Sequence, residues 1–157
     1  MTHKILFICL GNICRSATAE AVMKKLIADR GLSANFKIDS AGILSTHQGE
    51  RADSRMRFHA GKRGYDLTSI SRPVRTNDFD QFDLIIGMDD SNIDDLNDRA
   101  LTAEHKSKIH QMTEYSQKHN HTYIPDPYYG GATGFELVLD LLEDACEGLL
   151  NTLYPES

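Results

Sequence analysis

The chain opens with a buried-strand pattern that runs through a short loop into an amphipathic helix. Residues 4–9 are almost entirely apolar, and Gly11 follows the run closely. Apolar residues then recur at helical spacing until Gly31, at Ala19, Val22, Met23, Leu26 and Ile27. A short apolar run that ends at a glycine turn is typical of a strand buried on both faces of a parallel sheet. The chain is therefore predicted to begin with the first half of a β-α-β unit.

The rest of the sequence repeats this alternation of strands and helices. Further strands are predicted at residues 36–41, 83–88 and 108–112. Further helices are predicted at residues 53–63, from Asp89 or Asp90 to about 98, and at 133–153, where Thr133 and Glu136 suit a capping box. The alternation predicts an α/β fold with a parallel sheet covered by helices on both faces. In such folds ligands bind at loops that follow the carboxyl ends of strands, which directs attention to residues 9–16 and 126–129.

Composition sets limits on size, partners and compartment. A length of 157 residues suits one globular domain. The formal net charge of −6 and the scattered basic residues argue against a nucleic-acid partner. No apolar run approaches the ~20 residues of a membrane-spanning helix, so no membrane partner is predicted. Three cysteines are an odd and sparse set for a disulfide scaffold, which indicates a reducing compartment such as the cytoplasm.

The loop after the first strand has the composition of an oxyanion site. It consists of Cys9, Leu10, Gly11, Asn12, Ile13, Cys14, Arg15 and Ser16. If the loop curls, successive backbone N–H groups point inward, and the following helix adds the positive end of its dipole. Gly11 and Asn12 are residue types that tolerate the left-handed backbone of such a turn.

Three side chains of this loop suit phosphoryl transfer. The field of the N–H groups favours the thiolate of Cys9, which makes it a nucleophile without a histidine base. The planar fork of Arg15 can hold two phosphoryl oxygens at once. Ser16 is predicted to cap the helix and to donate to the Cys9 sulfur, which helps that sulfur to leave. The loop therefore predicts a covalent phosphocysteine.

The octet Cys9 to Ser16, together with Asp126, Pro127, Tyr128 and Tyr129, resembles the low-molecular-weight protein tyrosine phosphatases over essentially the whole chain. The resemblance implies a four-stranded parallel twisted sheet with helices on both faces and the phosphate loop between the first strand and first helix. It also implies that residues 1–157 form a single phosphatase domain without metal or organic cofactor. Protein phosphotyrosine and small aryl phosphates would be substrates, and inorganic phosphate or other oxyanions would be ligands.

The same resemblance assigns roles outside the loop. Asp126 fits the family's general acid, which protonates the leaving tyrosyl oxygen and then activates water, so a mildly acidic pH optimum is expected. Tyr128 and Tyr129 would form the walls of the substrate cleft, although packing and regulatory phosphorylation remain open for both. Thr46 stands where similar phosphatases tend to carry a bulky aromatic residue, which affects peptide preference.

Two further positions concern the rigidity of the loop. Ser40 matches a serine that supports the phosphate loop through Asn12. Ser69 stands where the family often has a histidine of the same network, so the loop is expected to be held differently here.

The remaining cysteines and one aspartate have several interpretations. Cys14 is either a packing residue or, by the resemblance, a redox partner that forms a reversible disulfide with Cys9. Cys146 lies on the apolar face of the last helix and is predicted to pack in the core. Asp89 is predicted to cap the helix that follows it.

Metal binding is not predicted. Asp90, Asn92 and Asp94 have calcium-loop spacing, but Asp95 occupies the place of the required glycine. The histidines of the second half match no common zinc spacing; they are His105, His110, His119 and His121.

Three other functions fit the same loop less well. An arsenate reductase needs further cysteines, and residues 82–89 contain none. A phosphocarrier would not need both Arg15 and Asp126, which serve hydrolysis. A silent phosphotyrosine-binding module would not need the nucleophile Cys9.

Overall fold

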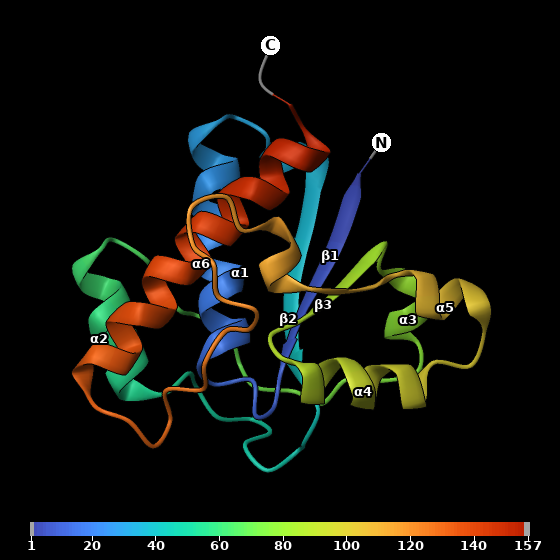
Figure 1. The fold of residues 1–157 in the computed structure, drawn as a ribbon, viewed down its shortest axis with the longest axis horizontal. Coiled ribbons are helices and arrows are strands. Elements are labelled where there is room, and N and C mark those ends of the chain that lie inside the picture. Colours follow the sequence, from blue (N-terminus) through green and yellow to red (C-terminus); the bar gives the residue numbers. More distant parts are fainter. Residues whose placement is uncertain (1, 156–157) are drawn as a thin grey trace.

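The computed structural model describes residues 2–155, and these contain a four-stranded parallel sheet with the order β2-β1-β3-β4 (Figure 1). β1 (His3–Cys9) lies between β2 (Phe36–Gly42) and β3 (Leu84–Gly87), and β4 (Ile109–Gln111) pairs with β3. The predicted α/β fold is confirmed, and each strand lies within or close to its predicted range.

Helices cover both faces of the sheet, as predicted (Figure 1). One face carries α1 (Arg15–Asp29), α2 (Ser54–Lys62) and α6 (Ala132–Leu153). The other carries α3 (Asp78–Gln81), α4 (Asp90–Arg99) and α5 (Ala103–Ser107). Two short 3₁₀ helices complete the described part, η1 (Ser33–Asn35) and η2 (Met112–Tyr115). Within residues 2–155, none of these helices has the length and apolarity needed to cross a membrane.

The central strand β1 supplies both hydrophobic cores. Ile5 and Phe7 belong to a cluster that includes residues of α1, α2 and α6. Leu6 and Ile8 belong to a second cluster formed with residues around α3 and α4. Successive residues of a strand point to opposite faces of the sheet. Because helices cover both faces, all four side chains are fully buried. Cys146 is buried in the first cluster, as predicted.

The starts of two helices follow the prediction and that of α6 does not. Asp53 caps α2 by accepting from two backbone N–H groups, and Asp89 caps α4 by accepting from Asn92 N at 2.8 Å. The Thr133–Glu136 capping box is wrong, because α6 begins at Ala132 without a side-chain cap. Glu136 instead pairs with Arg63 at 2.7 Å, where both partners are charged, whereas the box offers the carboxylate only a neutral N–H donor.

The strand order places a crevice at the carboxyl end of β1. β2 and β3 lie on opposite sides of β1, so the connections that follow β1 and β3 run to opposite faces of the sheet. Loops that leave such neighbouring strands diverge and leave room between them for a ligand. The loop of residues 9–16, here called the Cys9 loop, lies at this point.

Candidate active site

The Cys9 loop turns sharply between β1 and α1. Asn12 has a φ of 58°, which confirms the left-handed conformation predicted for it. The left-handed conformation predicted for Gly11 is wrong, since this glycine does not adopt a positive φ. A glycine is needed at this position for its small size. A Cβ atom at Gly11 would lie 3.0 Å from Cδ2 of His47. The glycine therefore allows the loop to pack closely against the His47 ring.

Ser16 is directed at the Cys9 sulfur. Its Oγ lies 3.1 Å from Sγ of Cys9, and it accepts from Nδ2 of Asn12 at 2.8 Å. Because the Asn12 amide donates to that oxygen, the hydroxyl hydrogen of Ser16 is free to point at the sulfur. The predicted cap by Ser16 is wrong: α1 begins at Arg15, and its N-cap is Cys14 without a side-chain bond. The Ser16 hydroxyl therefore contacts Asn12 and Cys9 rather than the backbone of α1.

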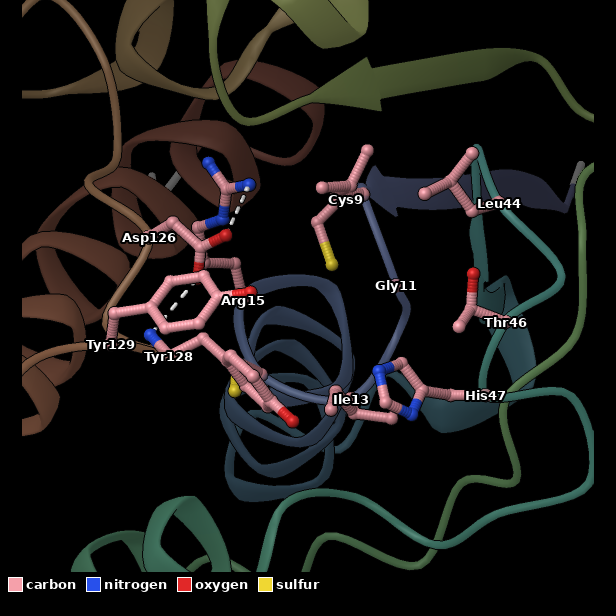
Figure 2. Close-up of a pocket in the computed structure, with 12 residues that line it drawn as sticks. Cys9, Gly11, Ile13, Arg15, Leu44, Thr46, His47, Asp126, Tyr128 and Tyr129 are labelled. Atoms are coloured by element: carbon pink, nitrogen blue, oxygen red, sulfur yellow. Dashed lines mark hydrogen bonds and ion pairs between the residues drawn. The ribbon is translucent and has the colours of Figure 1, made fainter.

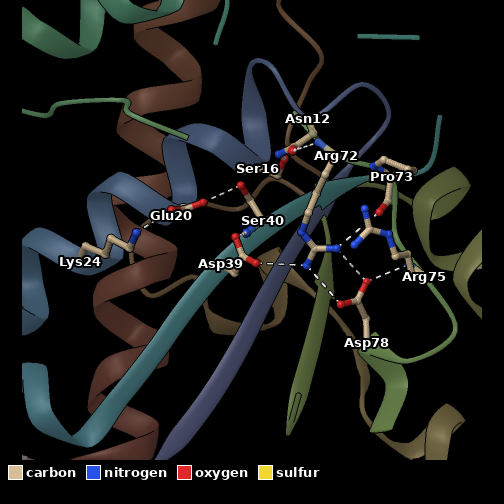
Figure 3. Close-up of polar contacts among 10 residues, drawn as sticks. All are labelled: Asn12, Ser16, Glu20, Lys24, Asp39, Ser40, Arg72, Pro73, Arg75 and Asp78. Atoms are coloured by element: carbon tan, nitrogen blue, oxygen red, sulfur yellow. Dashed lines mark hydrogen bonds and ion pairs between the residues drawn. The ribbon is translucent and has the colours of Figure 1, made fainter. Parts of the chain in front are cut away.

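A segment that was not predicted from the sequence holds the Cys9 loop in place. Oδ1 of Asn12 accepts from the N–H of Arg72 at 3.1 Å (Figure 3). The Ser71 hydroxyl donates to the Gly11 carbonyl at 2.9 Å. The Arg72 carbonyl accepts from Gly42 N at the end of β2. The loop is therefore held by Ser71 and Arg72, two and three residues after Ser69.

Ser40 makes a different contact from the predicted one. In place of a bond that supports Asn12, its hydroxyl donates to Oε1 of Glu20 at 2.6 Å (Figure 3). Glu20 lies on α1 and also pairs with Lys24 at 2.6 Å. A buried carboxylate is a stronger acceptor than an amide oxygen, which explains the choice. Ser40 thus ties β2 to α1, and its effect on the Cys9 loop is indirect.

Arg15 is buried and fixed by partners distant in sequence. It is 2% exposed, and its Nη1 donates to Oδ2 of Asp89 at 2.7 Å and to the Ile124 carbonyl at 3.0 Å. Nη2 lies 3.6 Å from Oδ2 of Asp126. Burial alone would lower the pKa of Arg15, but Cys9, Asp89 and Asp126 outweigh it and raise that pKa. The guanidinium therefore stays charged, and Asp89 has a second role beyond its cap.

The Cys9 loop forms the base of a pocket with walls from two other segments, residues 44–47 and 126–129 (Figure 2). Figure 2 shows Asp126 and Arg15 on one side of the Cys9 sulfur and Leu44 and Thr46 on the other. The lining comprises Cys9, Leu10, Gly11, Ile13, Cys14, Arg15, Leu44, Thr46, His47, Asp126, Tyr128 and Tyr129. The structure thus brings together the predicted groups at the carboxyl ends of β1 and β2 and in the loop before α6.

Aromatic rings stand at the mouth of this pocket. The rings of Tyr128 and Tyr129 meet edge to face at 5.0 Å, and Tyr129 is 95% exposed. The His47 ring lies 6.0 Å from that of Tyr128 and was not identified from the sequence. Exposed rings beside a polar base suit an aromatic ligand with an anionic end.

Cys14 lies in the same pocket but in a different environment. It is buried and unpaired, like Cys9 and Cys146. Burial raises the pKa of the Cys14 thiol, and the negative charges of Asp53 and Cys9 add to the rise. Within residues 2–155, no group of three or more His, Cys, Asp or Glu side chains is arranged to hold a metal ion.

A thiol at the base of an oxyanion pocket, with a buried guanidinium and a carboxyl group beside it, defines a cysteine-dependent site for phosphoryl transfer on an α/β fold. The family model described as low molecular weight phosphotyrosine protein phosphatase matches residues 4–157. The chain therefore belongs to the low molecular weight phosphotyrosine protein phosphatases.

Individual proteins are similar to this chain along nearly their whole length. A mouse low molecular weight phosphotyrosine protein phosphatase is 38% identical over 154 residues, which are 98% of this chain and 97% of the relative. The crystal structure of a protein tyrosine phosphatase from Entamoeba histolytica, with Hepes in its active site, is 51% identical. It superposes with a TM-score of 0.94 and covers 97% of both chains. A Drosophila arginine phosphatase is 32% identical, with a TM-score of 0.90 over 98% of this chain and 99% of that protein.

Proposed function

We propose that this protein hydrolyses protein phosphotyrosine and small aryl phosphates through a phosphocysteine at Cys9. The observation that carries the proposal is the Cys9 sulfur, 3.1 Å from the Ser16 hydroxyl in the pocket that Arg15 also lines. Backbone N–H groups of the Cys9 loop and the Arg15 guanidinium bind the three phosphoryl oxygens. The loop residues in this role are Leu10, Gly11, Asn12, Ile13, Cys14 and Ser16.

In the first step, the Cys9 thiolate attacks phosphorus and the bond to the tyrosyl oxygen breaks. Asp126 donates its proton to that oxygen, so the product leaves as tyrosine rather than as a phenolate. Oδ2 of Asp126 lies 3.6 Å from Nη2 of Arg15, beside the position of the phosphoryl group. The positive charge of Arg15 offsets the charge of the phosphoryl oxygens as they flatten.

In the second step, water attacks the phosphorus of the phosphocysteine and the P–S bond breaks. The Asp126 carboxylate takes a proton from that water, and inorganic phosphate leaves. The Ser16 hydroxyl donates to the departing sulfur, which stabilises it as a thiolate. The enzyme returns to its starting state, and every group that reacts in the two steps comes from the protein, the substrate or water.

The substrate cleft is assigned to Thr46, Tyr128 and Tyr129. The aromatic rings and the apolar side chains of Leu10 and Ile13 suit the flat phenol of phosphotyrosine, and the family model that matches this chain is named for that substrate. Phosphotyrosine is therefore favoured here over the phosphoarginine that the Drosophila relative's name implies. Turnover of free phosphoarginine at a rate equal to that of phosphotyrosine would contradict this choice.

Several wider properties belong to the same proposal. Residues 1–157 act as one phosphatase domain in the cytoplasm, with inorganic phosphate and other oxyanions as ligands, and without nucleic-acid or membrane partners. The family match over residues 4–157 and the net charge of −6 support these assignments. Cys14 is proposed to form a reversible disulfide with Cys9, which protects the nucleophile from further oxidation.

The direct test is hydrolysis of phosphotyrosine and of an activated aryl phosphate by wild type, Cys9→Ser and Asp126→Ala, with chelator present. Cys9→Ser should abolish turnover while phosphate binding persists. Asp126→Ala should lower phosphotyrosine turnover by about 10²- to 10⁴-fold, as expected when a general acid is lost, with a milder effect on the activated ester. Turnover that survives Cys9→Ser would remove the proposed mechanism.

A further inference from the structure

Arg55, in the first turn of α2, contacts the loop that carries Asp126. Its Nη2 donates to the Tyr128 carbonyl at 2.8 Å. Its guanidinium carbon lies 5.4 Å from the centroid of the Tyr128 ring and 4.9 Å from that of Phe135 on α6. A hydrogen bond and two cation–π contacts thus converge on one side chain, which restricts the loop more than a single contact would.

Asp53 orients the Arg55 guanidinium. Oδ1 of Asp53 accepts from Nε of Arg55 at 3.2 Å, and Oδ2 accepts from Nη2 at 3.0 Å. The same carboxylate accepts from the backbone N–H groups of Arg55 and Met56. Burial would raise the pKa of Asp53, but the bonds from Arg55 and from these N–H groups outweigh it and lower that pKa. The carboxylate is therefore charged at neutral pH and fixed at the start of α2.

The Asp53–Arg55 pair is also attached to the Cys9 loop. The backbone N–H of Asp53 donates to the Ile13 carbonyl at 2.8 Å. The start of α2 therefore contacts the loop that holds the nucleophile on one side and the segment that holds Asp126 on the other. Nothing in the spacing of these residues indicates the connection, because 73 positions separate Arg55 from Tyr128.

Tyr128 links Arg55 to Asp126. Its N–H donates to Oδ1 of Asp126 at 3.1 Å (Figure 2). Its carbonyl accepts from Arg55. The backbone carbonyl of Tyr128 is therefore held by Arg55, and its backbone N–H is bonded to the carboxyl group of Asp126. The Asp126 side chain is 40% exposed, so it gains little orientation from burial.

We propose that Arg55, oriented by Asp53, is a positioning residue that sets the distance between Asp126 and the Cys9 loop. The inference rests on the proposed function, in which Asp126 is the general acid. A general acid acts only within hydrogen-bond reach of the leaving oxygen, and a displacement of about 1 Å can cost about 10²-fold in rate. Loss of Arg55 therefore weakens proton transfer while the Cys9 nucleophile remains in place.

The test uses kcat/KM, which reports the steps up to departure of the aryl group, for two substrates. Phosphotyrosine needs a proton on its leaving oxygen, whereas the phosphate ester of a dinitrophenol releases a stable anion without one. Arg55→Ala should lower kcat/KM for phosphotyrosine by about tenfold, a fraction of the general-acid contribution, and should change it less than about threefold for the dinitrophenyl ester.

A double variant separates positioning from general damage. Since Arg55 acts through Asp126, Arg55→Ala should cause no further loss on phosphotyrosine in an Asp126→Ala background. Arg57→Ala is the matched control: Arg57 lies two residues further along α2, and its Nε donates to the Ala52 carbonyl at 2.9 Å. In this control, the ratio of kcat/KM for phosphotyrosine to kcat/KM for the dinitrophenyl ester should stay at the wild-type value.

Each of the following four results would overturn the inference. Equal losses on both substrates in Arg55→Ala would show that Arg55 only shapes the cleft or the fold. Additive losses in the double variant would show that it acts independently of Asp126. If Asp126→Ala loses more kcat/KM on phosphotyrosine than on the dinitrophenyl ester but Arg55→Ala does not, the inference is rejected and the proposed function stands. If Asp126→Ala itself shows no such difference between the substrates, the acid assignment fails and the inference fails with it.

Discussion

At the scale of single residues, Ser16 and Arg15 are each oriented by a second side chain. Asn12 donates to Ser16, so the Ser16 hydroxyl points at Cys9. Asp89 orients Arg15 in the same way, because its Oδ2 accepts from Nη1 of Arg15. Because the partner fixes the reactive group before substrate binds, less ordering is required during the reaction.

The two roles of Asp89 can be separated by substitution. Asp89→Asn keeps an oxygen to cap α4 but removes the charge that faces Arg15, whereas Asp89→Ala removes both. Both variants should lower kcat/KM by about 10- to 100-fold, the cost of a misplaced binding group. Only Asp89→Ala should also lose about 1 kcal/mol of unfolding free energy through the lost cap, measured by urea denaturation. Wild-type kcat/KM in Asp89→Asn would contradict the role in holding Arg15.

The sequence predicts the part of the site that is local. The eight residues from Cys9 to Ser16 place nucleophile, guanidinium and hydroxyl in one loop, and their spacing alone indicates an oxyanion site. The contacts that orient them are not local: Asp89 lies 74 positions from Arg15, and Arg72 lies 60 positions from Asn12. Such pairs depend on how the strands are ordered, which residue spacing does not specify.

At the scale of elements, the four strands and the long periodic helices were predictable, and the short helices α3 and α5 were not. The strand β1 and the helices α1 and α6 have apolar patterns long enough to identify their type. α3 and α5 have four and five residues, too few for a helical period to be recognised. The predicted start of α6 is also wrong, because Glu136 bonds to Arg63 on another segment rather than to a backbone N–H in the first turn of α6.

Asp144 connects α6 to the segment that leads to Ile124 and Asp126. Its carboxylate accepts from the backbone N–H groups of Gln117, Lys118 and His119 at 3.0 to 3.2 Å. Burial would raise the pKa of Asp144, but these bonds outweigh it and lower that pKa. A carboxyl group whose folded pKa is depressed stabilises the fold above its unfolded pKa and loses that stabilisation as the pH falls through the folded pKa.

Asp144→Ala should therefore destabilise the protein in a pH-dependent way. At neutral pH the variant should lose about 1–3 kcal/mol of unfolding free energy, the usual cost of leaving N–H groups without a charged acceptor. The difference from wild type should shrink as the pH falls below the ordinary aspartate pKa of about 3.9. Urea denaturation of both proteins at pH 7 and at acid pH measures this difference in unfolding free energy. A difference that grows on acidification would contradict the prediction.

Gly148 allows α6 to pack directly against η2. A Cβ atom at this position would overlap the carbonyl oxygen of Tyr115. Gly148→Ala gains helix propensity of about 1 kcal/mol, but the backbone must move apart, and overpacking of this kind costs about 1–3 kcal/mol or more. A lower midpoint of thermal unfolding is therefore expected. Gly61→Ala, on α2, is the control, since no atom lies within 4 Å of the added Cβ atom; equal stability of both variants would contradict close packing at Gly148.

At the scale of the whole molecule, the proposed anion site belongs to a chain of net charge −6. Attraction of a phosphate group must therefore be local, from the N–H groups of the Cys9 loop and from Arg15. The site lies at the carboxyl end of the central strand, between the two helical layers, so the packing on both faces of the sheet supports it.

Binding of inorganic phosphate should consequently stabilise the fold as a whole. A ligand at about 100 times its Kd adds about 2.7 kcal/mol to the unfolding free energy. For a protein of this size, each 1 kcal/mol raises Tm by about 2–4 °C, so a rise of several degrees is expected in phosphate relative to chloride at equal ionic strength. Cys9→Ser should keep this ligand-induced rise, because the N–H groups and Arg15 remain. Arg15→Met should lose most of it, and chelator should leave it unchanged; an undiminished rise in Arg15→Met would place phosphate binding elsewhere on the molecule.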